Sequence, residues 1–283
     1  MIELVVTDLD GTLWAYGSLG VPHPRTLAAW RELERRGVPV LVATGRRLTT
    51  TREPLATHNL APAAVVLNGA LAVDLASGER FHRFTFDVDT AARVLDAFRA
   101  GDLEPCVYVE HDDYDVYIGA RPSTSAEHLR ALGTRAVEAD LDAVVASVPV
   151  LSFGVFGKHE EEIARVLAGL ARVADPRVTH GDFGGHGVTV GPVGLSKWTG
   201  VLAYCERHGI DADRVLAIGD GAATDIAGAS GFGILANSAT VTNSGTISAG
   251  AGGIGIDAGT TAMVTNSGTI SGGAFGIQAT PLR

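Results

Sequence analysis

The feature that most constrains this chain is an apolar strand that ends in two aspartates. Residues 4–12 read Leu-Val-Val-Thr-Asp-Leu-Asp-Gly-Thr. An apolar run followed by turn residues predicts a buried parallel strand over 2–7, and open α/β sheets bind ligands at the carboxyl ends of such strands. Asp8 and Asp10 begin on the same side of the chain, so both can converge on one cation or one phosphorus atom. A solvated turn that ends an ordinary strand is the alternative.

The following residues predict a βαβ unit. Apolar residues at helical spacing favour a helix over 26–36, and Gly37 is typical of a helix end. A second apolar strand is expected over 38–42, and Thr44-Gly45-Arg46 comes shortly after it. A strand, a helix and a strand of these lengths form a right-handed crossover in a parallel sheet.

Asn68-Gly69 separates two short apolar runs within residues 65–73. This dipeptide between apolar runs is a strong signal of a β-hairpin. The turn accounts for Asn68 by itself, and a contact between Asn68 and a ligand is the alternative.

The middle of the chain has a different pattern, typical of a small inserted α+β domain. From residue 188 the α/β pattern resumes: Lys197 opens a predicted helix that extends to His208, and a strand over 215–218 precedes Gly219-Asp220-Gly221. We therefore predict a discontinuous core over 1–79 and 188–235, an inserted domain over 80–187 and a tail over 236–283. The inserted domain is predicted to contain strands near 81–86, 106–110, 115–118 and 150–156 and helices near 90–100 and 160–173.

The tail repeats itself. Val-Thr-Asn-Ser-Gly-Thr-Ile-Ser occurs at 241–248 and again at 264–271, a shift of 23 residues. Such self-similarity resembles the β-solenoids of autotransporter and adhesin passenger domains. A disordered linker is the alternative, since barely two and a half copies are present. The repeat suggests a fusion junction between Gly219 and Gly231, which would leave one sheet edge poorly covered.

Composition excludes several classes of partner. The net charge is −10, and no run of Lys or Arg is present, which argues against a nucleic acid or an anionic membrane. Cys106 and Cys205 lie outside any Cys-x-x-Cys spacing, so reduced thiols and a cytoplasmic location are expected. No signal peptide and no membrane-spanning apolar segment is visible. The oligomeric state does not follow from the sequence.

Four motifs occur in order: Asp8-x-Asp10-Gly-Thr, Thr44-Gly45-Arg46, Lys197 and Gly219-Asp220-Gly221. This set resembles the haloacid dehalogenase (HAD) superfamily, in particular the Cof-type phosphatases with an α/β cap, over roughly residues 1–221. The resemblance implies an α/β fold with a doubly wound, Rossmann-like parallel sheet and an inserted α+β cap. It also implies a Mg²⁺-dependent phosphatase that acts on a small phosphorylated metabolite, such as a sugar phosphate. A phosphotransferase or mutase is a variant within this class.

The resemblance assigns a role to each catalytic residue. Asp8 would attack phosphorus and form an aspartyl-phosphate. Asp10 would protonate the leaving oxygen and later accept a proton from water. The Thr44 hydroxyl would hold phosphoryl oxygens, and Lys197 would add positive charge in the transition state. Taken singly, Thr44-Gly45 also reads as a helix cap, and Lys197 as an ordinary surface lysine.

Further residues are assigned to metal and substrate. Mg²⁺ would lie between Asp8, the Asp10 carbonyl and Asp220. The fourth motif departs from the family pattern because the Asn of Gly-Asp-Gly-x-Asn-Asp is missing, and Asp225 stands one residue later than expected. Asp225 is the remaining metal candidate, and it could instead belong to the repeat. Gly45, Arg46 and Asn68 are candidates for substrate binding.

A second hypothesis comes from another functional class. The chain would then be a catalytically impaired chimera, or a binding module whose relevant part is the adhesin-like tail. Absence of metal-dependent phosphatase activity would favour this reading.

Overall fold

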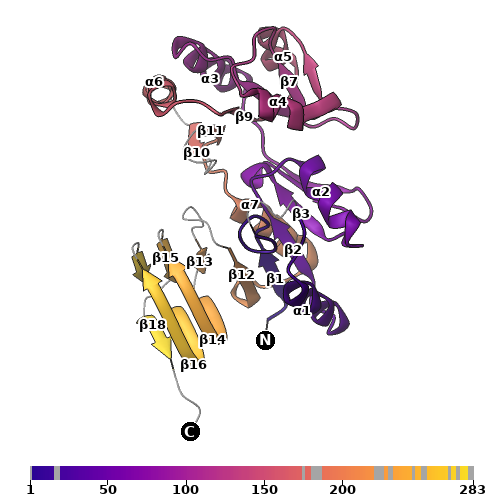
Figure 1. Ribbon diagram of the computed structural model, residues 1–283, viewed down its shortest axis with the longest axis vertical. Coiled ribbons are helices and arrows are strands. Elements are labelled where there is room, and N and C mark those ends of the chain that lie inside the picture. Colours follow the sequence, from indigo (N-terminus) through magenta and orange to yellow (C-terminus); the bar gives the residue numbers. More distant parts are fainter. Residues whose placement is uncertain are drawn as a thin grey trace. The chain divides into compact units, whose positions relative to one another are not determined.

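A computed structural model describes residues 2–15, 20–173, 176–179 and 187–219, and in the tail 226–228, 232–243, 246–249, 254–266, 269–271 and 275–279. The chain divides into two compact units (Figure 1). The first unit consists of Met1–Val66, Ala72–Phe81 and Trp198–Arg283, and the second of Leu67–Leu71 and His82–Lys197. The domain limits predicted from the sequence stay a prediction.

The first unit is built on a six-stranded sheet whose parallel strands carry the predicted motifs. Strand β1 pairs in parallel with β12 on one side and β2 on the other, and β2 pairs in parallel with β3. This arrangement confirms the predicted doubly wound α/β fold. The order of the strands is β12 (Val215–Ile218), β1 (Leu4–Thr7), β2 (Val40–Ala43), β3 (Ala63–Val66), β4 (Leu71–Asp74) and β5 (Arg80–Arg83). Helices α1 (Pro24–Arg35), α2 (Leu48–Thr57) and α7 (Lys197–His208) accompany this sheet.

The predicted helix over 26–36 is present as α1, and it begins two residues earlier. The ring of His23 accepts a hydrogen bond from the Arg25 amide, and Pro24 occupies the first turn. Proline fits there because its missing N–H would have no partner within the helix. Trp30 is buried on the inner face of α1, and its indole N–H donates to Glu34 at 2.9 Å.

The chain passes from the first sheet to the second just after β5. The Phe84 amide donates to the Ala70 carbonyl at 2.8 Å, next to β4, whereas the Phe86 amide donates to the Val150 carbonyl at 3.0 Å, at the start of β9 (Val150–Phe156). The strand predicted over 81–86 is therefore wrong in its placement. Its ordered part, β5, belongs to the first sheet because the chain keeps pairing beside β4 before it crosses over.

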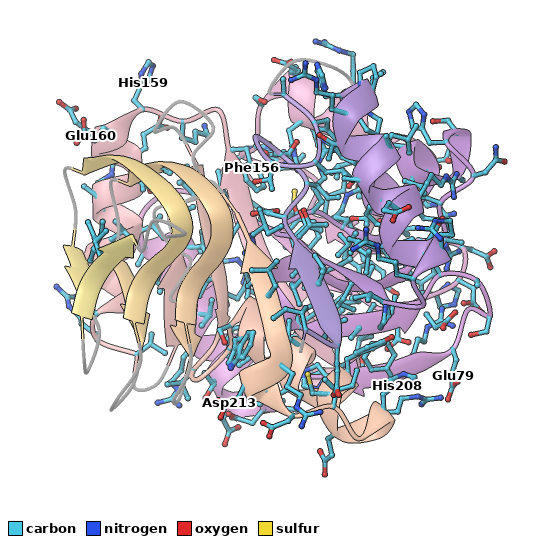
Figure 2. All side chains as sticks on the ribbon, turned by 90° about the horizontal axis from the view of Figure 1, so that it is seen from below. Glu79, Phe156, His159, Glu160, His208 and Asp213 are labelled. Carbon is cyan, nitrogen blue, oxygen red and sulfur yellow. The ribbon has the colours of Figure 1, made fainter. Side chains whose placement is uncertain are left out.

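The second unit is an α+β domain with its own core. Phe98 of α3 and Phe153 of β9 are fully buried at its centre, with ring centroids 6.2 Å apart. The Glu162 carboxylate accepts the His159 amide at 2.9 Å where α6 begins, and Figure 2 shows His159 and Glu160 pointing outward there. The sheet runs β10 (Pro176–Thr179), β11 (Gly187–Pro192), β9 (Val150–Phe156), β6 (Cys106–Val109), β7 (Val116–Ile118) and β8 (Ala136–Glu138), with helices α3 (Val88–Ala100), α4 (Ala126–Leu132), α5 (Leu141–Ser147) and α6 (Glu160–Leu170).

The described parts of the tail are strands that pair in parallel with the next copy of the repeat. Asn243 pairs with Asn266, 23 residues further along, which is the shift of the repeated segment. The resemblance to an adhesin solenoid stays a prediction. One three-stranded sheet contains β13 (Ile226–Gly228), β15 (Thr246–Ala249) and β17 (Thr269–Ser271), and the other contains β14 (Phe232–Asn243), β16 (Ile254–Asn266) and β18 (Phe275–Ala279).

Among the described residues, none of the helices has both the length and the apolar character needed to span a bilayer.

Candidate active site

The candidate site is built at the carboxyl ends of neighbouring parallel strands. Thr7 at the end of β1 pairs with Val42 of β2 and with Ile218 of β12. The Asp8 amide donates to the Ile218 carbonyl at 2.9 Å, so the pairing continues one residue beyond the strand. Asp8 and Thr44 therefore follow adjacent strands at the same edge of the sheet, as the sequence predicted.

A tight turn fixes the backbone after β1. The Leu9 carbonyl accepts hydrogen bonds from the amides of Thr12, Leu13 and Trp14 at 3.2, 2.9 and 3.1 Å. Leu9 and Leu13 are buried and anchor the turn in the core. Gly11 has a φ of 73°, a backbone conformation that glycine adopts without steric cost. The turn thus holds the two aspartates at the sheet edge.

Asp8 is oriented by the backbone around it. Its Oδ1 atom accepts the Leu9 amide at 2.7 Å, and the Thr7 hydroxyl donates to the Asp8 carbonyl at 2.8 Å. A carboxylate whose one oxygen is held by an adjacent backbone N–H keeps a fixed direction. A fixed direction is one requirement of a carboxylate that acts as a nucleophile.

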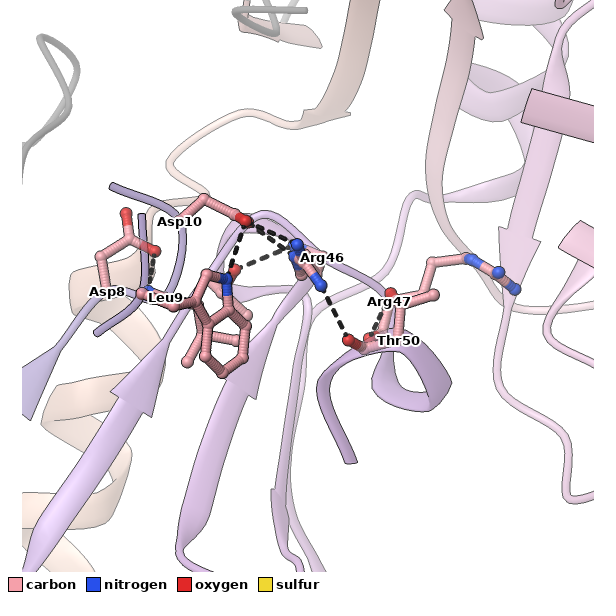
Figure 3. A network of polar contacts seen from close by, with 8 residues as sticks. Asp8, Leu9, Asp10, Arg46, Arg47 and Thr50 are labelled. Carbon is pink, nitrogen blue, oxygen red and sulfur yellow. Dashed lines mark hydrogen bonds and ion pairs between the residues drawn. The ribbon is translucent and has the colours of Figure 1, made fainter. Parts of the chain in front are cut away.

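Asp10 lies in a different network (Figure 3). Arg46 donates through Nε to Oδ2 at 2.6 Å and through Nη2 to Oδ1 at 2.5 Å, and the indole N–H of Trp14 donates to Oδ1 at 3.1 Å. The two charged side chains are 32% and 30% exposed for Asp10 and Arg46. A two-pronged arginine–carboxylate pair fixes both distance and orientation.

Arg46 is itself held from three directions. Its guanidinium lies 5.2 Å from the centre of the Trp14 ring, its Nη1 donates to the Thr50 carbonyl at 3.2 Å, and its amide donates to the Thr44 hydroxyl at 3.2 Å. Thr44 is buried, and its own amide donates to the Val65 carbonyl at 2.8 Å. The segment that follows β2 therefore supports Asp10 at the end of β1.

The alternative reading of Thr44-Gly45 as a helix cap does not hold. Helix α2 begins at Leu48, and Arg47 occupies the capping position without a side-chain cap. Thr44 instead accepts the Arg46 amide, as described above. Gly45 lies between these two residues and continues the turn from β2 toward α2.

The other predicted residues are placed as follows. Lys197 is the first residue of α7. Asn68 lies in the turn Leu67–Gly69 with a φ of 56°, so it forms the predicted turn between β3 and β4, which are neighbours in the sheet. Asp220 and Asp225 lie outside the described residues, and the structure does not bear on their role.

The donor chemistry at the end of β1 fits a hard cation. Asp8 contributes a carboxylate and Asp10 a backbone carbonyl, and oxygen donors of this kind are those that Mg²⁺ prefers. The Asp10 carboxylate is engaged with Arg46 and Trp14. Among the described residues no cluster of three or more His, Cys, Asp or Glu side chains forms a metal site.

Sequence reasoning missed Trp14 and left Arg46 as a candidate for substrate binding. Trp14 is 2% exposed and both donates to Asp10 and lies against Arg46. The available signal was the tryptophan four residues after the second aspartate. A large aromatic residue in a turn directly after a strand suggests that its ring packs beside that aspartate. The Asp10–Arg46 pair joins residues 36 positions apart, which no local pattern reveals.

This arrangement defines a class: an α/β core with a parallel sheet, an aspartate pair at the end of its first strand and an inserted α+β unit. The model of the haloacid dehalogenase-like hydrolases matches residues 5–227, and the chain belongs to this family.

Comparisons with individual proteins agree with this family assignment. A phosphoglycolate phosphatase from Methanopyrus kandleri is 28% identical over 225 residues, which cover 78% of each chain. A solved HAD phosphatase from Bacteroides thetaiotaomicron matches with a TM-score of 0.64 and 19% identity, over 80% of both chains. A solved sugar phosphatase of HAD subclass IIB matches with a TM-score of 0.61 and 19% identity, over 77% of this chain and 81% of the other. At such identities the solved structures show a shared fold.

Proposed function

We propose that this protein is a Mg²⁺-dependent phosphomonoester hydrolase that acts on a small phosphorylated metabolite through an aspartyl-phosphate on Asp8. The observation that carries the proposal is the pair of aspartates with unlike environments at the end of β1. Asp8 is directed by a backbone amide, and Asp10 is held by a guanidinium and an indole. Family membership and the phosphatase relatives support the reaction class.

In the proposed reaction Asp8 attacks phosphorus while the bond to the leaving alcohol breaks. Asp10 supplies the proton that the leaving oxygen takes up. Water then attacks the phosphoaspartate, and Asp10 accepts a proton from that water, so the second half returns both carboxyl groups to their starting state. In this structure both oxygens of Asp10 accept hydrogen bonds from Arg46, so one of these contacts has to open before Asp10 can carry the proton that it donates. The other contact keeps the carboxyl group oriented.

The proposed cation would be held by Asp8, the Asp10 carbonyl and Asp220, with Asp225 in support. Mg²⁺ bound there would supply positive charge that reduces the repulsion between an attacking carboxylate and a phosphate dianion. Thr44 and the Gly45 backbone are proposed to bind phosphoryl oxygens, and Lys197 is proposed to add a compact positive charge in the transition state.

The substrate class follows from the relatives only as a proposal. A phosphoglycolate phosphatase and a sugar phosphatase are among the similar proteins, so sugar phosphates and phosphorylated hydroxy acids are the first candidates. Cys106 and Cys205 are both buried thiols, which supports a reducing compartment such as the cytoplasm.

The decisive test replaces Asp8 and removes the metal. Asp8→Asn is expected to abolish phosphate release from p-nitrophenyl phosphate without changing the circular dichroism spectrum, since the amide cannot form a stable phosphoenzyme. Asp96→Asn, on the exposed face of α3, is the matched control and should keep full activity. EDTA should stop the wild-type reaction, and added Mg²⁺ should restore it. Full turnover by Asp8→Asn would overturn the nucleophile assignment, and inactivity of the wild type over a broad panel of phosphate esters would favour the binding-module hypothesis.

A further inference from the structure

The turn Leu67–Gly69 carries an unusual backbone. Three consecutive residues have positive φ values, 49° for Leu67, 56° for Asn68 and 109° for Gly69. Asparagine and glycine adopt such angles readily, whereas leucine pays roughly 1–2 kcal/mol for a left-handed conformation. A conformation of this kind persists only where its surroundings impose it, and such positions cluster at functional sites.

The surroundings of Gly69 identify what imposes the turn. A Cβ atom at this position would lie 1.9 Å from the Ser196 carbonyl oxygen, 2.6 Å from its carbonyl carbon and 3.2 Å from the Lys197 amide nitrogen. All three atoms belong to the backbone, which cannot rotate aside as a flexible side chain does. Gly69 is therefore packed directly against the peptide bond that leads into Lys197, and no larger residue fits without moving that bond.

A second contact to the backbone of Gly69 comes from His82. The imidazole of His82 forms a hydrogen bond with the Gly69 backbone, and its Nε2 atom is buried without a partner among the described residues. The ring stacks on Phe84 with centroids 6.4 Å apart and planes 8° from parallel. His82 thus fixes the turn that lies against the start of α7.

We infer that Gly69 is a positioning residue for Lys197. Because Gly69 has no side chain, the turn after β3 can pack directly against the Ser196–Lys197 peptide bond. This packing fixes the position of the Lys197 backbone, from which the lysine side chain extends. The inference rests on the proposed function, in which Lys197 supplies charge to the reaction. Gly69 touches no reacting atom and acts only through the backbone that carries Lys197.

The chain offers a matched control for the substitution that tests this. Gly78 has a φ of 79°, yet a Cβ there would meet nothing within 4 Å. Gly69→Ala and Gly78→Ala therefore share the strain of a left-handed alanine, and only the first collides with backbone. Gly69→Ala is expected to lower kcat for p-nitrophenyl phosphate at least tenfold, with Gly78→Ala within twofold of wild type.

A double-mutant comparison separates positioning from general damage. Lys197→Ala should lose activity, and adding Gly69→Ala to it should cause little further loss, because the group being positioned is gone. Multiplicative losses would overturn the inference, and so would full activity of Lys197→Ala.

A second readout does not depend on activity. The sequence contains only two lysines, Lys158 and Lys197. After reductive methylation with ¹³C-formaldehyde, the Lys197 signal should move in Gly69→Ala and stay in place in Gly78→Ala, while the Lys158 signal serves as an internal reference for folding. A Lys197 signal that stays unmoved in folded Gly69→Ala overturns the inference. Since the signal is read without substrate, an inactive wild type would refute the proposed function and leave this placement measurable.

Discussion

The Asp10–Arg46 pair makes the sharpest prediction about the site, namely that Arg46 acts through Asp10 and not on the substrate. In Arg46→Lys an ammonium can replace one of the two hydrogen bonds to Asp10 at 2.5 and 2.6 Å, because lysine lacks the planar fork. Each side chain is about one-third exposed, so solvent reduces the value of the pair. We expect the unfolding free energy to fall by about 1 kcal/mol or less.

The expected loss of activity is larger than the loss of stability. With one hydrogen bond gone, the Asp10 carboxylate is restrained only by the single hydrogen bond from the substituted lysine and by the Trp14 indole at 3.1 Å, and it loses the planar two-pronged contact that fixes its direction. General acid catalysis contributes roughly 10²–10⁴-fold, and partial loss of orientation should remove about one order of magnitude, equal to ~1.4 kcal/mol. We therefore expect kcat/KM for an alkyl phosphate to fall roughly tenfold in Arg46→Lys.

The choice of ester distinguishes the two roles of Arg46. The value of kcat/KM reports the steps up to the departure of the alcohol. The p-nitrophenolate ion departs without protonation by an acid, whereas an alkyl alcohol needs a proton from the acid in order to leave. The loss should accordingly be large for glycerol phosphate and small for p-nitrophenyl phosphate. Arg31→Lys is the matched control, because Arg31 donates to the Glu34 carboxylate at 2.8 Å and to the His58 carbonyl at 2.9 Å on the surface of the same unit. Equal losses on both esters would refute the reasoning and assign Arg46 to direct phosphate binding.

Three further predictions concern stability and ionisation. A Cβ on Gly200 would lie 2.6 Å from Cγ1 of fully buried Val65, so Gly200→Ala should lower the unfolding free energy in urea by about 1–3 kcal/mol. Burial lowers the pKa of His82 below its ordinary 6.5, so the unfolded chain takes up this proton at a higher pH than the folded chain does, and stability should fall as pH drops through 6.5. That loss is at most about 1.4 kcal/mol per pH unit, and it should be smaller in His82→Gln when urea unfolding is compared at pH 7.5 and 5.5. The hydrogen bond to Tyr114 raises the pKa of Tyr117 to about 12, and Tyr114→Phe should return it toward 10.0 in an ultraviolet titration.

The parallel strands of the first unit could be predicted from the sequence because they are short apolar runs, and β1, β2 and β3 are buried along their whole length. The predicted strands over 2–7, 38–42 and 215–218 correspond to β1, β2 and β12. Each is a short apolar run, the simplest pattern for a parallel strand. The prediction also placed Asp8 and Thr44 at one edge, because parallel strands end on the same side.

Helix α2 could not be predicted in the same way. It is Leu48–Thr57, contains Pro54, and buries only Thr51 and Leu55. Three consecutive threonines and an internal proline disfavour a helix by local propensity. Tertiary packing decides the conformation here, and Leu55 is fully buried. The short helices α4 and α5 were missed because seven residues give too few turns to show a period.

Asp8 and Asp10 illustrate what a motif contains and what it lacks. Their spacing predicts that they act together, yet nothing in two identical side chains says which one attacks and which one transfers the proton. The surroundings supply that difference: a neighbouring backbone amide directs Asp8, while Asp10 accepts hydrogen bonds from Arg46 and Trp14. Paired carboxylates with unlike partners can perform different steps of one reaction. In the proposed reaction this division of labour depends on Arg46, which follows β2 and meets Asp10 because β1 and β2 are neighbours in the sheet. A variant that folds but loses this contact should keep its nucleophile and lose its acid.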